Sequence, residues 1–243
     1  MSVWDNVSKI LIQGAMNTEI EYLLNMCQPL RETKIYDHIF WVCSIGEKEI
    51  IVSKTGIGIV NATIATMLSI SHFSPDVIIN QGIAGGYSRD IHIGDIIIGR
   101  YCRNINTYKI PFRKEGAGSN PFDWEPNKRG KECIEGNEEL AKSMYSFIKE
   151  EYSKSVQLGT LGSGDLFNKE FDRILWMNGR YNVLSEDMES IGVYSVAKEL
   201  GIPCIGVRII SNNELLNESL DKSQAVVLQK LLFQGILGGT AFE

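Results

Sequence analysis

Hydrophobic residues along the chain alternate between short β-branched runs and longer segments in which apolar positions recur at helical spacing. The run Val77-Ile78-Ile79-Asn80 is typical of a buried parallel strand, whereas Val193, Val196 and Leu200 form one apolar stripe of a helix. On this basis strands are predicted at residues 10–13, 35–44, 49–53, 77–80, 96–98, 156–161, 183–184 and 202–210, and helices from 18 onward and at 60–72, 137–152, 190–200 and 223–233. The alternation predicts an α/β fold: a single domain over residues 1–243, with a central mixed β-sheet flanked by helices.

Local signals predict where two of the helices begin. Thr18 and Glu21 match the capping-box pattern, in which a hydroxyl and a carboxylate bind backbone N–H groups of the first turn, so a helix is expected to start there. Asn137 followed by Glu138 and Glu139 predicts the start of an exposed amphipathic helix, because acidic side chains favour the positive end of a helix dipole.

Residues 104–131 break the alternation and are predicted to form an irregular insertion. This segment contains Pro111, Pro121 and Pro126 together with several glycines. Loops of this length in compact domains are usually functional or mobile. Two interpretations stay open for it: a lid or subunit contact that shapes a binding pocket, or a solvated insertion.

Composition narrows the class of protein. The 243 residues are 44% hydrophobic and 22% charged, and the net charge of -6 argues against nucleic acid or an anionic membrane as the main partner. No apolar run approaches the roughly 18 residues that a membrane span needs, and the N-terminal residues do not resemble a signal peptide. The five cysteines and three histidines are scattered without metal-ligand spacing, so we expect a reduced cytoplasmic protein with no metal site.

Glycine-rich or polar segments follow most of the predicted strands. They cover residues 15–19, 55–58, 82–86, 163–167, 186–189 and 211–214. Ligands of α/β proteins bind outside the carboxyl ends of strands, where such segments meet. The sequence contains no GxGxxG, GxxxxGK[ST] or GxSxG match. No motif therefore supports a dinucleotide-binding site, a P-loop or the nucleophile elbow of an α/β-hydrolase.

Six short motifs occur in a specific order and spacing. They are Gly14-Ala15-Met16 with Glu19, Thr55-Gly56-Ile57-Gly58, Ile79-Asn80-Gln81-Gly82-Ile83-Ala84-Gly85-Gly86, Ser163-Gly164-Asp165, Asp187-Met188-Glu189, and Arg208 with Ser211. Together they resemble the nucleoside phosphorylase/nucleosidase superfamily, and most of all its 5′-methylthioadenosine/S-adenosylhomocysteine nucleosidases. The resemblance covers nearly the whole chain and is loose over residues 104–131 and the last helix. It implies a cytoplasmic salvage enzyme, acting in methionine salvage, that needs no cofactor or metal and forms a homodimer or a larger homo-oligomer.

The resemblance implies hydrolysis of the N-glycosidic bond of a purine nucleoside, which releases free base and a ribose derivative. The reaction passes through a ribosyl cation, so the site has to stabilise positive charge on the sugar and hydrogen-bond the base. By resemblance, Glu19 binds and deprotonates the attacking water, and Glu189 holds the ribose hydroxyls and places negative charge beneath the cation. Asn212 stands where the methylthioadenosine enzymes have an aspartate that donates a proton towards N7 of adenine.

The same resemblance assigns further residues to substrate binding. Phe167 is expected to stack on the purine, Met188 to pack beneath the ribose, and Arg208 to orient the site carboxylates. Ser211 is expected to position the residue that follows it. The other expected binding residues are Ala15, Met16, Ile57, Ile83, Ala84 and Gly85, of which Ile57 and Ala84 would line the alkylthio and sugar regions.

Three positions depart from the pattern of the relatives. The amide of Asn212 can hydrogen-bond a purine but cannot relay a proton, and an asparagine here resembles phosphorylases that prefer 6-oxopurines, so the base preference stays open. Ile83 replaces a serine or threonine, and Asn80 stands where hexameric phosphorylases carry an arginine. Without that hydroxyl and that cation a tight phosphate site is not expected. Water is therefore the expected nucleophile, and a purine nucleoside phosphorylase and a non-catalytic nucleoside-binding relative are the alternatives.

Overall fold

The computed structural model of the protein describes residue 4 and residues 7–127 and 132–237. Within these residues ten strands form one mixed sheet in the order β11-β10-β6-β12-β5-β1-β4-β3-β2, with β9 paired to β6. Their bounds are β1 Lys9–Gly14, β2 Arg31–Ile35, β3 His38–Ile45, β4 Lys48–Lys54, β5 Val77–Gly86, β6 Ile96–Asn104, β9 Cys133–Glu135, β10 Val156–Ser163, β11 Val183–Asp187 and β12 Cys204–Asn212.

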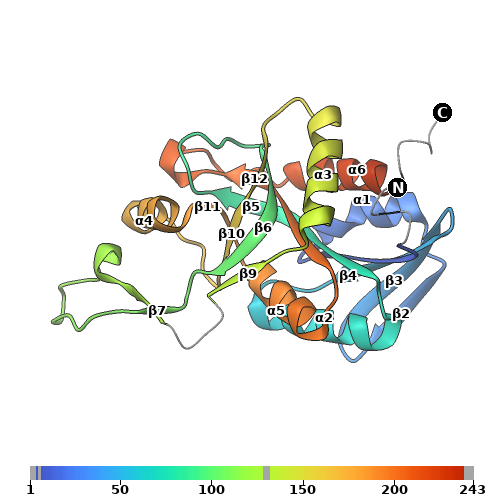
Figure 1. Ribbon diagram of the computed structural model, residues 1–243, viewed down its shortest axis with the longest axis horizontal. Coiled ribbons are helices and arrows are strands. Elements are labelled where there is room, and N and C mark those ends of the chain that lie inside the picture. The colour runs from blue at the N-terminus through green and yellow to red at the C-terminus, as the bar shows by residue number, and fades with distance from the viewer. Residues whose placement is uncertain (1–3, 5–6, 128–131, 238–243) are drawn as a thin grey trace.

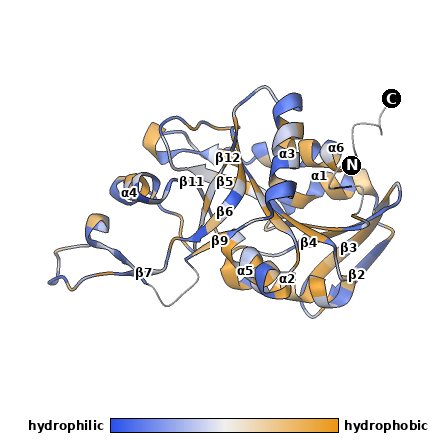
Figure 2. Cartoon of the chain, in the orientation of Figure 1, coloured by the Kyte–Doolittle hydropathy of each residue, from blue (hydrophilic) through white to orange (hydrophobic). Residues whose placement is uncertain are grey.

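Helices cover both faces of this sheet. They are α1 Asn17–Cys27, α2 Ile59–Phe73, α3 Glu138–Glu151, α4 Phe171–Tyr181, α5 Ser190–Leu200 and α6 Gln224–Leu237. Figure 1 shows α1, α3 and α6 on one side of the sheet and α2 and α5 on the other. Two hydrophobic cores fill the interfaces between the sheet and these helix layers. Figure 2 shows hydrophobic residues concentrated where α2 and α5 meet the strands. The predicted α/β class, with a single mixed sheet flanked by helices, is confirmed.

The strands in the middle of the sheet owe their apolar sequences to burial on both faces. Strand β1 pairs in parallel with β4 and with β5, and β5 pairs in parallel with β12. Every residue of β12 is buried, so this strand, which was predicted at residues 202–210, lacks the polar/apolar alternation of a strand with one exposed face.

One half of the sheet closes on itself. Strand β11 pairs in parallel with β10 and also in antiparallel orientation with β5. The five strands β5, β12, β6, β10 and β11 therefore form a ring of hydrogen-bonded neighbours. This closure brings the carboxyl ends of β5, β11 and β12, which are far apart in the sequence, to one place.

Several predicted elements are confirmed, and three local predictions are wrong. The helices at 60–72, 137–152 and 190–200 match α2, α3 and α5 within one or two residues. Helix α1, however, begins at Asn17 after Met16, and the carboxylate that caps it is that of Glu19, not Glu21. The strand predicted at residues 35–44 is divided, because a turn after Ile35 separates β2 from β3.

The glycine-rich segment 82–86 was expected to follow a strand that ends at residue 80, but it continues strand β5. Strand pairing satisfies its backbone groups on both sides, by β12 and by β11, and this non-local pairing outweighs the turn preference of glycine. Helix α4, with Ile174 and Met177 buried on one side, was not predicted.

The segment predicted as an irregular insertion carries short elements in its described part. Strands β7 (Tyr108–Lys109) and β8 (Glu125–Pro126) form a small antiparallel sheet beside the 3-10 helix η2 (Pro121–Asp123). Tyr108 and Trp124 pack against Trp176 of α4, with ring centroids 5.0 and 5.7 Å from the Trp176 ring. Residues 128–131 of the predicted insertion lie outside the described residues. Among the residues that are described, no helix has the length and apolarity to cross a membrane.

Candidate active site

A pocket opens at the carboxyl ends of the strands, and twelve of the thirteen predicted site residues line it. The pocket contains about 860 Å³ of empty space, part of which is open to solvent, a size that suits a small-molecule ligand. The predicted residues in its wall are Ala15, Met16, Glu19, Ile57, Ile83, Ala84, Gly85, Phe167, Met188, Glu189, Ser211 and Asn212. The thirteenth, Arg208, is 1% exposed and is not among the residues that line the pocket.

Glu19 projects from the first turn of α1 and is 3% exposed. Its Oε2 accepts hydrogen bonds from the backbone N–H groups of Ala15 and Met16, at 2.7 and 3.1 Å, and its Oε1 accepts one from Ile83 at 2.9 Å. Burial raises the pKa of Glu19 above its ordinary value, although these hydrogen bonds and the charge of Arg208 act in the opposite direction. The result is an oriented carboxyl group that is ready to take up a proton.

Glu189 precedes α5 and presents a second carboxyl group to the same pocket. Its Oε1 accepts a hydrogen bond from the backbone N–H of Gly58 at 2.9 Å, which ties the β11–α5 junction to the turn before α2. Burial, together with the charge of Asp187, raises the pKa of Glu189 to about 7, and Glu19 is close enough to contribute. The pocket thus holds two carboxyl groups whose pKa values are both raised, in each case chiefly by burial.

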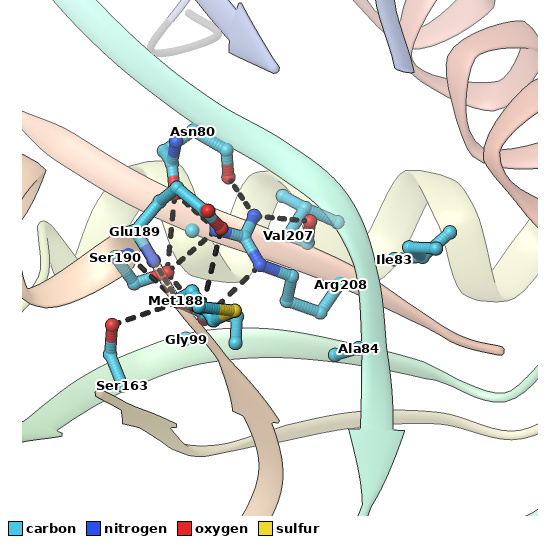
Figure 3. A network of polar contacts seen from close by, with 12 residues as sticks. Asn80, Ile83, Ala84, Gly99, Ser163, Met188, Glu189, Ser190, Val207 and Arg208 are labelled. Carbon is cyan, nitrogen blue, oxygen red and sulfur yellow. Dashed lines mark hydrogen bonds and ion pairs between the residues drawn. The ribbon is translucent and has the colours of Figure 1, made fainter. Parts of the chain in front are cut away.

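Arg208 of β12 is the centre of a buried hydrogen-bond network beside the site. Its guanidinium donates to Oδ2 of Asp187 at 3.1 Å, to the backbone oxygen of Asn80 at 2.9 Å and to the Ser190 hydroxyl at 2.8 Å. It also donates to the side-chain oxygen of Asn80. Figure 3 shows the guanidinium among these groups, with Met188 and Glu189 close to it.

The side chain of Asn80 is therefore occupied by the protein itself. Besides Arg208, its Oδ1 also accepts a hydrogen bond from the Ser190 hydroxyl at 3.2 Å, and the residue is 1% exposed. Asn80 occupies the position where hexameric phosphorylases carry an arginine. Its side chain helps to hold Arg208 in place and is not part of the pocket wall.

A β-bulge places Ser211 and Asn212 at the pocket. The register between β12 and β5 shifts between Ile210, opposite Ala84, and Asn212, opposite Gly85, so Ser211 is the extra residue. The Ser211 hydroxyl donates to Oδ1 of Asn212 at 3.0 Å. This contact leaves the Nδ2 group of Asn212 as a free hydrogen-bond donor on the side of Gly85, where a Cβ atom would lie 3.5 Å from it.

Apolar side chains form the rest of the wall. Phe167 is 58% exposed and Ile57 is 51% exposed, so both offer free hydrophobic surface, and Met188 is half-buried in the same pocket wall. A flat ring system can stack on an exposed phenyl group of this kind.

Sequence reasoning did not assign several polar residues of the pocket wall to the site. Three of them, Tyr87, Asn168 and Glu186, stand next to a residue or motif that was identified, and Glu214 and Lys222 also line the wall. Tyr87 and the backbone N–H of Asn168 both donate to the carboxylate of Glu186. Burial raises the pKa of Glu186 to about 8. Its place beside Asp187 was the available signal, but the sequence gives no indication of which way the side chain points.

Comparison with known proteins assigns the chain to a family. The model of the phosphorylase superfamily matches residues 9–231. A 5′-methylthioadenosine/S-adenosylhomocysteine nucleosidase of Haemophilus influenzae is 30% identical over 207 residues, which are 84% of this chain and 85% of the relative. The enzyme of the same name from an Exiguobacterium species is 28% identical over 220 residues, 88% of this chain and 90% of the relative.

Solved structures agree with this assignment. A mutant of the futalosine hydrolase of Helicobacter pylori superposes with a TM-score of 0.80 at 25% identity, covering 96% of this chain and 99% of that one. A mutant of the 5′-methylthioadenosine/S-adenosylhomocysteine nucleosidase from the same organism, with 5′-methylthioadenosine in its active site, gives a TM-score of 0.79 at 25% identity over 94% of this chain and 98% of that one. The chain therefore belongs to the phosphorylase superfamily and is similar to its nucleosidase members.

Proposed function

We propose that the protein is an N-glycosidase that hydrolyses purine nucleosides of the 5′-methylthioadenosine/S-adenosylhomocysteine type. The observation that carries the proposal is the pair of buried carboxyl groups, Glu19 and Glu189, that line one pocket of a nucleosidase-like fold. Both pKa values are raised, mainly by burial. Such a site suits a reaction in which one carboxylate accepts a proton and another faces a developing cation.

In the proposed reaction the bond between C1′ of the ribose and N9 of the purine breaks, and a water oxygen bonds to C1′. Glu19 takes the proton of that water. Glu189 binds the ribose hydroxyls and stabilises the positive charge that develops on the sugar. The amide of Asn212 donates a hydrogen bond to N7 of the leaving base, and because an amide has no acidic proton to give, the base takes its proton from solvent.

The other predicted contacts complete the proposed binding mode. Phe167 stacks on the purine and Met188 packs beneath the ribose, where an unbranched thioether adapts to the sugar. Ile57 and Ala84 line the region of the 5′ substituent and the sugar, with Ala15, Met16, Ile83 and Gly85 closing the wall. Ser211 orients Asn212 through its hydroxyl, and Arg208 orients the carboxyl groups through Asp187.

Water is the proposed nucleophile in preference to phosphate. The side-chain oxygen of Asn80 already accepts hydrogen bonds from Arg208 and Ser190. Ile83 has no hydroxyl group. Of the described residues that line the pocket, Lys222 is the one cationic side chain, and it is exposed to solvent. A tight phosphate site needs several strong donors or cations around the anion.

The proposal is tested by incubating the protein with 5′-methylthioadenosine, S-adenosylhomocysteine, adenosine and inosine, each with and without phosphate, and measuring free base by chromatography. We expect base release that does not depend on phosphate. The Glu19→Gln variant should lose turnover and still bind a product analogue, whereas Glu21→Gln, on the exposed side of the same helix, should keep full activity. Release that requires phosphate would identify a phosphorylase, and equal activity of Glu19→Gln would refute the role of Glu19.

We further propose that the enzyme is cytoplasmic, acts in methionine salvage and works as a homodimer or larger homo-oligomer. Support for assembly comes from α2, beside the pocket, where Val60, Ile64 and Met67 form an exposed apolar stripe, 66%, 44% and 42% exposed. A stripe of this spacing is typical of a helix that packs against a partner. Sedimentation of the wild type and of Ile64→Glu tests this: a monomeric wild type would refute it.

A further inference from the structure

Two buried glutamine side chains reach helix α1 from different parts of the chain. Gln229 lies on α6, which packs beside α1 (Figure 1), and it is 0% exposed. Gln81 lies on β5 and is 1% exposed. Neither residue is among those that line the pocket. Burying an amide group costs free energy unless its polar atoms are hydrogen-bonded, so the partners of these two side chains show what each of them holds.

The amide of Gln229 spans the first turns of α1. Its Nε2 donates to the backbone oxygen of Thr18 at 2.8 Å, and its Oε1 accepts from the backbone N–H groups of Tyr22 and Leu23 at 3.1 and 3.3 Å. In a regular α-helix the N–H of Tyr22 would bond to the C=O of Thr18, so Gln229 bonds to both members of a pair that closes one turn. The side chain therefore fixes the position of this turn relative to α6.

Gln81 holds the next carbonyl group of α1 from the side of the sheet. Its Nε2 donates to the backbone oxygen of Glu19, whose carboxyl group in turn accepts from the N–H of Ile83 on the same strand. A Cβ atom at Gly14 would lie 2.9 Å from Nε2 of Gln81 and 2.9 Å from Cβ of Glu19, so the amide fits closely between β1 and α1. Both the main chain and the side chain of Glu19 are therefore attached to β5.

The amide oxygen of Gln81 indicates that stability alone does not explain this residue. It is buried, and it has no hydrogen-bond partner among the described residues. A buried acceptor without a partner destabilises a folded protein, and such groups in native structures call for a functional explanation. The one hydrogen bond that the Gln81 side chain makes within the described residues goes to the backbone of Glu19.

We propose that Gln81 and Gln229 are positioning residues for Glu19, which they hold in place through the backbone of its helix. This inference rests on the proposed function, in which Glu19 takes a proton from the attacking water. A proton acceptor has to lie within hydrogen-bonding distance of the group that it deprotonates. A displacement of about 1 Å can lower the rate by about 100-fold, so the two amides act on catalysis without touching the substrate.

The test replaces each glutamine by methionine, which keeps the length of the side chain and removes its hydrogen bonds. Gln81→Met and Gln229→Met should each lower kcat for base release from 5′-methylthioadenosine by about 10-fold or more. The KM should change by less than about threefold, because Glu19 acts on the water and not on the binding of the nucleoside. An unchanged kcat in the folded Gln81→Met variant would overturn the inference.

Two other glutamines provide matched controls, since neither has a hydrogen bond to α1 within the part of the chain that the structure describes. Gln13 of β1 is also 0% exposed, and its Oε1 accepts from the Thr66 hydroxyl of α2 at 3.0 Å. Gln224 begins α6, and its Nε2 donates to Asp221 at 2.8 Å. Gln13→Met and Gln224→Met should keep the wild-type kcat. Controls that are as slow as the two test variants would overturn the inference.

Amide hydrogen exchange tests the same inference without turnover. Three backbone N–H groups donate to the carboxyl group of Glu19, and their protection from exchange reports whether that group is in place. They belong to Ala15, Met16 and Ile83. Both test variants should lose protection at these amides by about 10-fold or more, while the amides of β3 and β4 stay protected. Wild-type protection at all three amides, or an equal loss over the whole chain, would overturn the inference.

Failure of the proposed hydrolysis is distinguishable from failure of this inference. Absence of base release from every nucleoside in the wild type would refute the hydrolysis, and the exchange measurement would still decide whether the two glutamines position Glu19. Circular dichroism shows whether each variant is folded. If Gln229→Met does not fold, Gln81→Met carries both measurements, because that substitution removes an unpartnered buried oxygen.

Discussion

Asp187 and Arg208 form an ion pair of 3.1 Å whose two side chains are only 1% and 2% exposed. Asp187 also accepts hydrogen bonds from the backbone N–H groups of Glu189 and Ser190, so it fixes the start of α5, from which Glu189 enters the pocket. Arg208 in turn is anchored on β12, four residues before Asn212. The pair therefore connects the sheet to the segment that carries one of the two proposed catalytic carboxylates.

Loss of Arg208 should be strongly destabilising, because it leaves the charge of Asp187 buried without a partner. We expect Arg208→Met to lower the free energy of unfolding by about 3–5 kcal/mol, measured by urea denaturation. The double variant Arg208→Met with Asp187→Asn should recover part of that loss, because it removes the orphaned charge. A single variant as stable as the wild type would contradict the assigned support role.

The activity should depend on pH through Glu189. Its pKa is raised to about 7, first by burial and then by the charge of Asp187, so the carboxylate form that stabilises a cation predominates only above that pH. We expect kcat/KM for base release to rise as the pH increases through about 7 and to fall below it. Glu189→Gln should be nearly inactive at every pH. A profile that is flat between pH 6 and pH 8, to within about twofold, would contradict this role.

Gly82 should be essential for the position of Glu19. A Cβ atom at residue 82 would lie 2.9 Å from Cδ of Glu19 and closer still to its Oε1, so Gly82→Ala should displace the carboxyl group and lower kcat by about 100-fold. Gly179→Ala in α4 is the matched control, because a Cβ there meets nothing within 4 Å. It should leave the activity unchanged and stabilise the helix by up to about 1 kcal/mol. Equal activity of the two variants would refute the argument.

The base-reading role of Asn212 can be tested by restoring an acid. Asn212→Asp should raise activity on adenine nucleosides roughly 10-fold or more, since a protonated carboxyl group can donate a proton towards N7. Ser211 is already placed to hold one oxygen of the new carboxyl group. Free adenine from 5′-methylthioadenosine is the quantity to measure, with inosine as the comparison substrate. Unchanged or lower adenine release would mean that the base is read in another way.

Local patterns account for much of the fold. The stripe formed by Val193, Val196 and Leu200 predicted α5 with its observed bounds, and Asn137 caps α3 as expected, accepting from Leu140. These predictions hold because helix periodicity and N-capping depend on residues within a few positions of one another. Helix α4, in contrast, begins after Glu170 without a side-chain capping hydrogen bond, so its start carries no such local signal.

The sequence by itself determined most of the strands and helices, although not α4, and the polar segments near the strand ends, because these follow from contacts between near neighbours in the chain. The tertiary structure alone decided how the segments meet. The closure of β11 onto β5 sets Gly85 between Asn212 and Glu186, and burial by distant segments raises the pKa values of Glu19 and Glu189. Strand register and desolvation both arise from residues that are far apart in the sequence, and no short stretch of sequence encodes them.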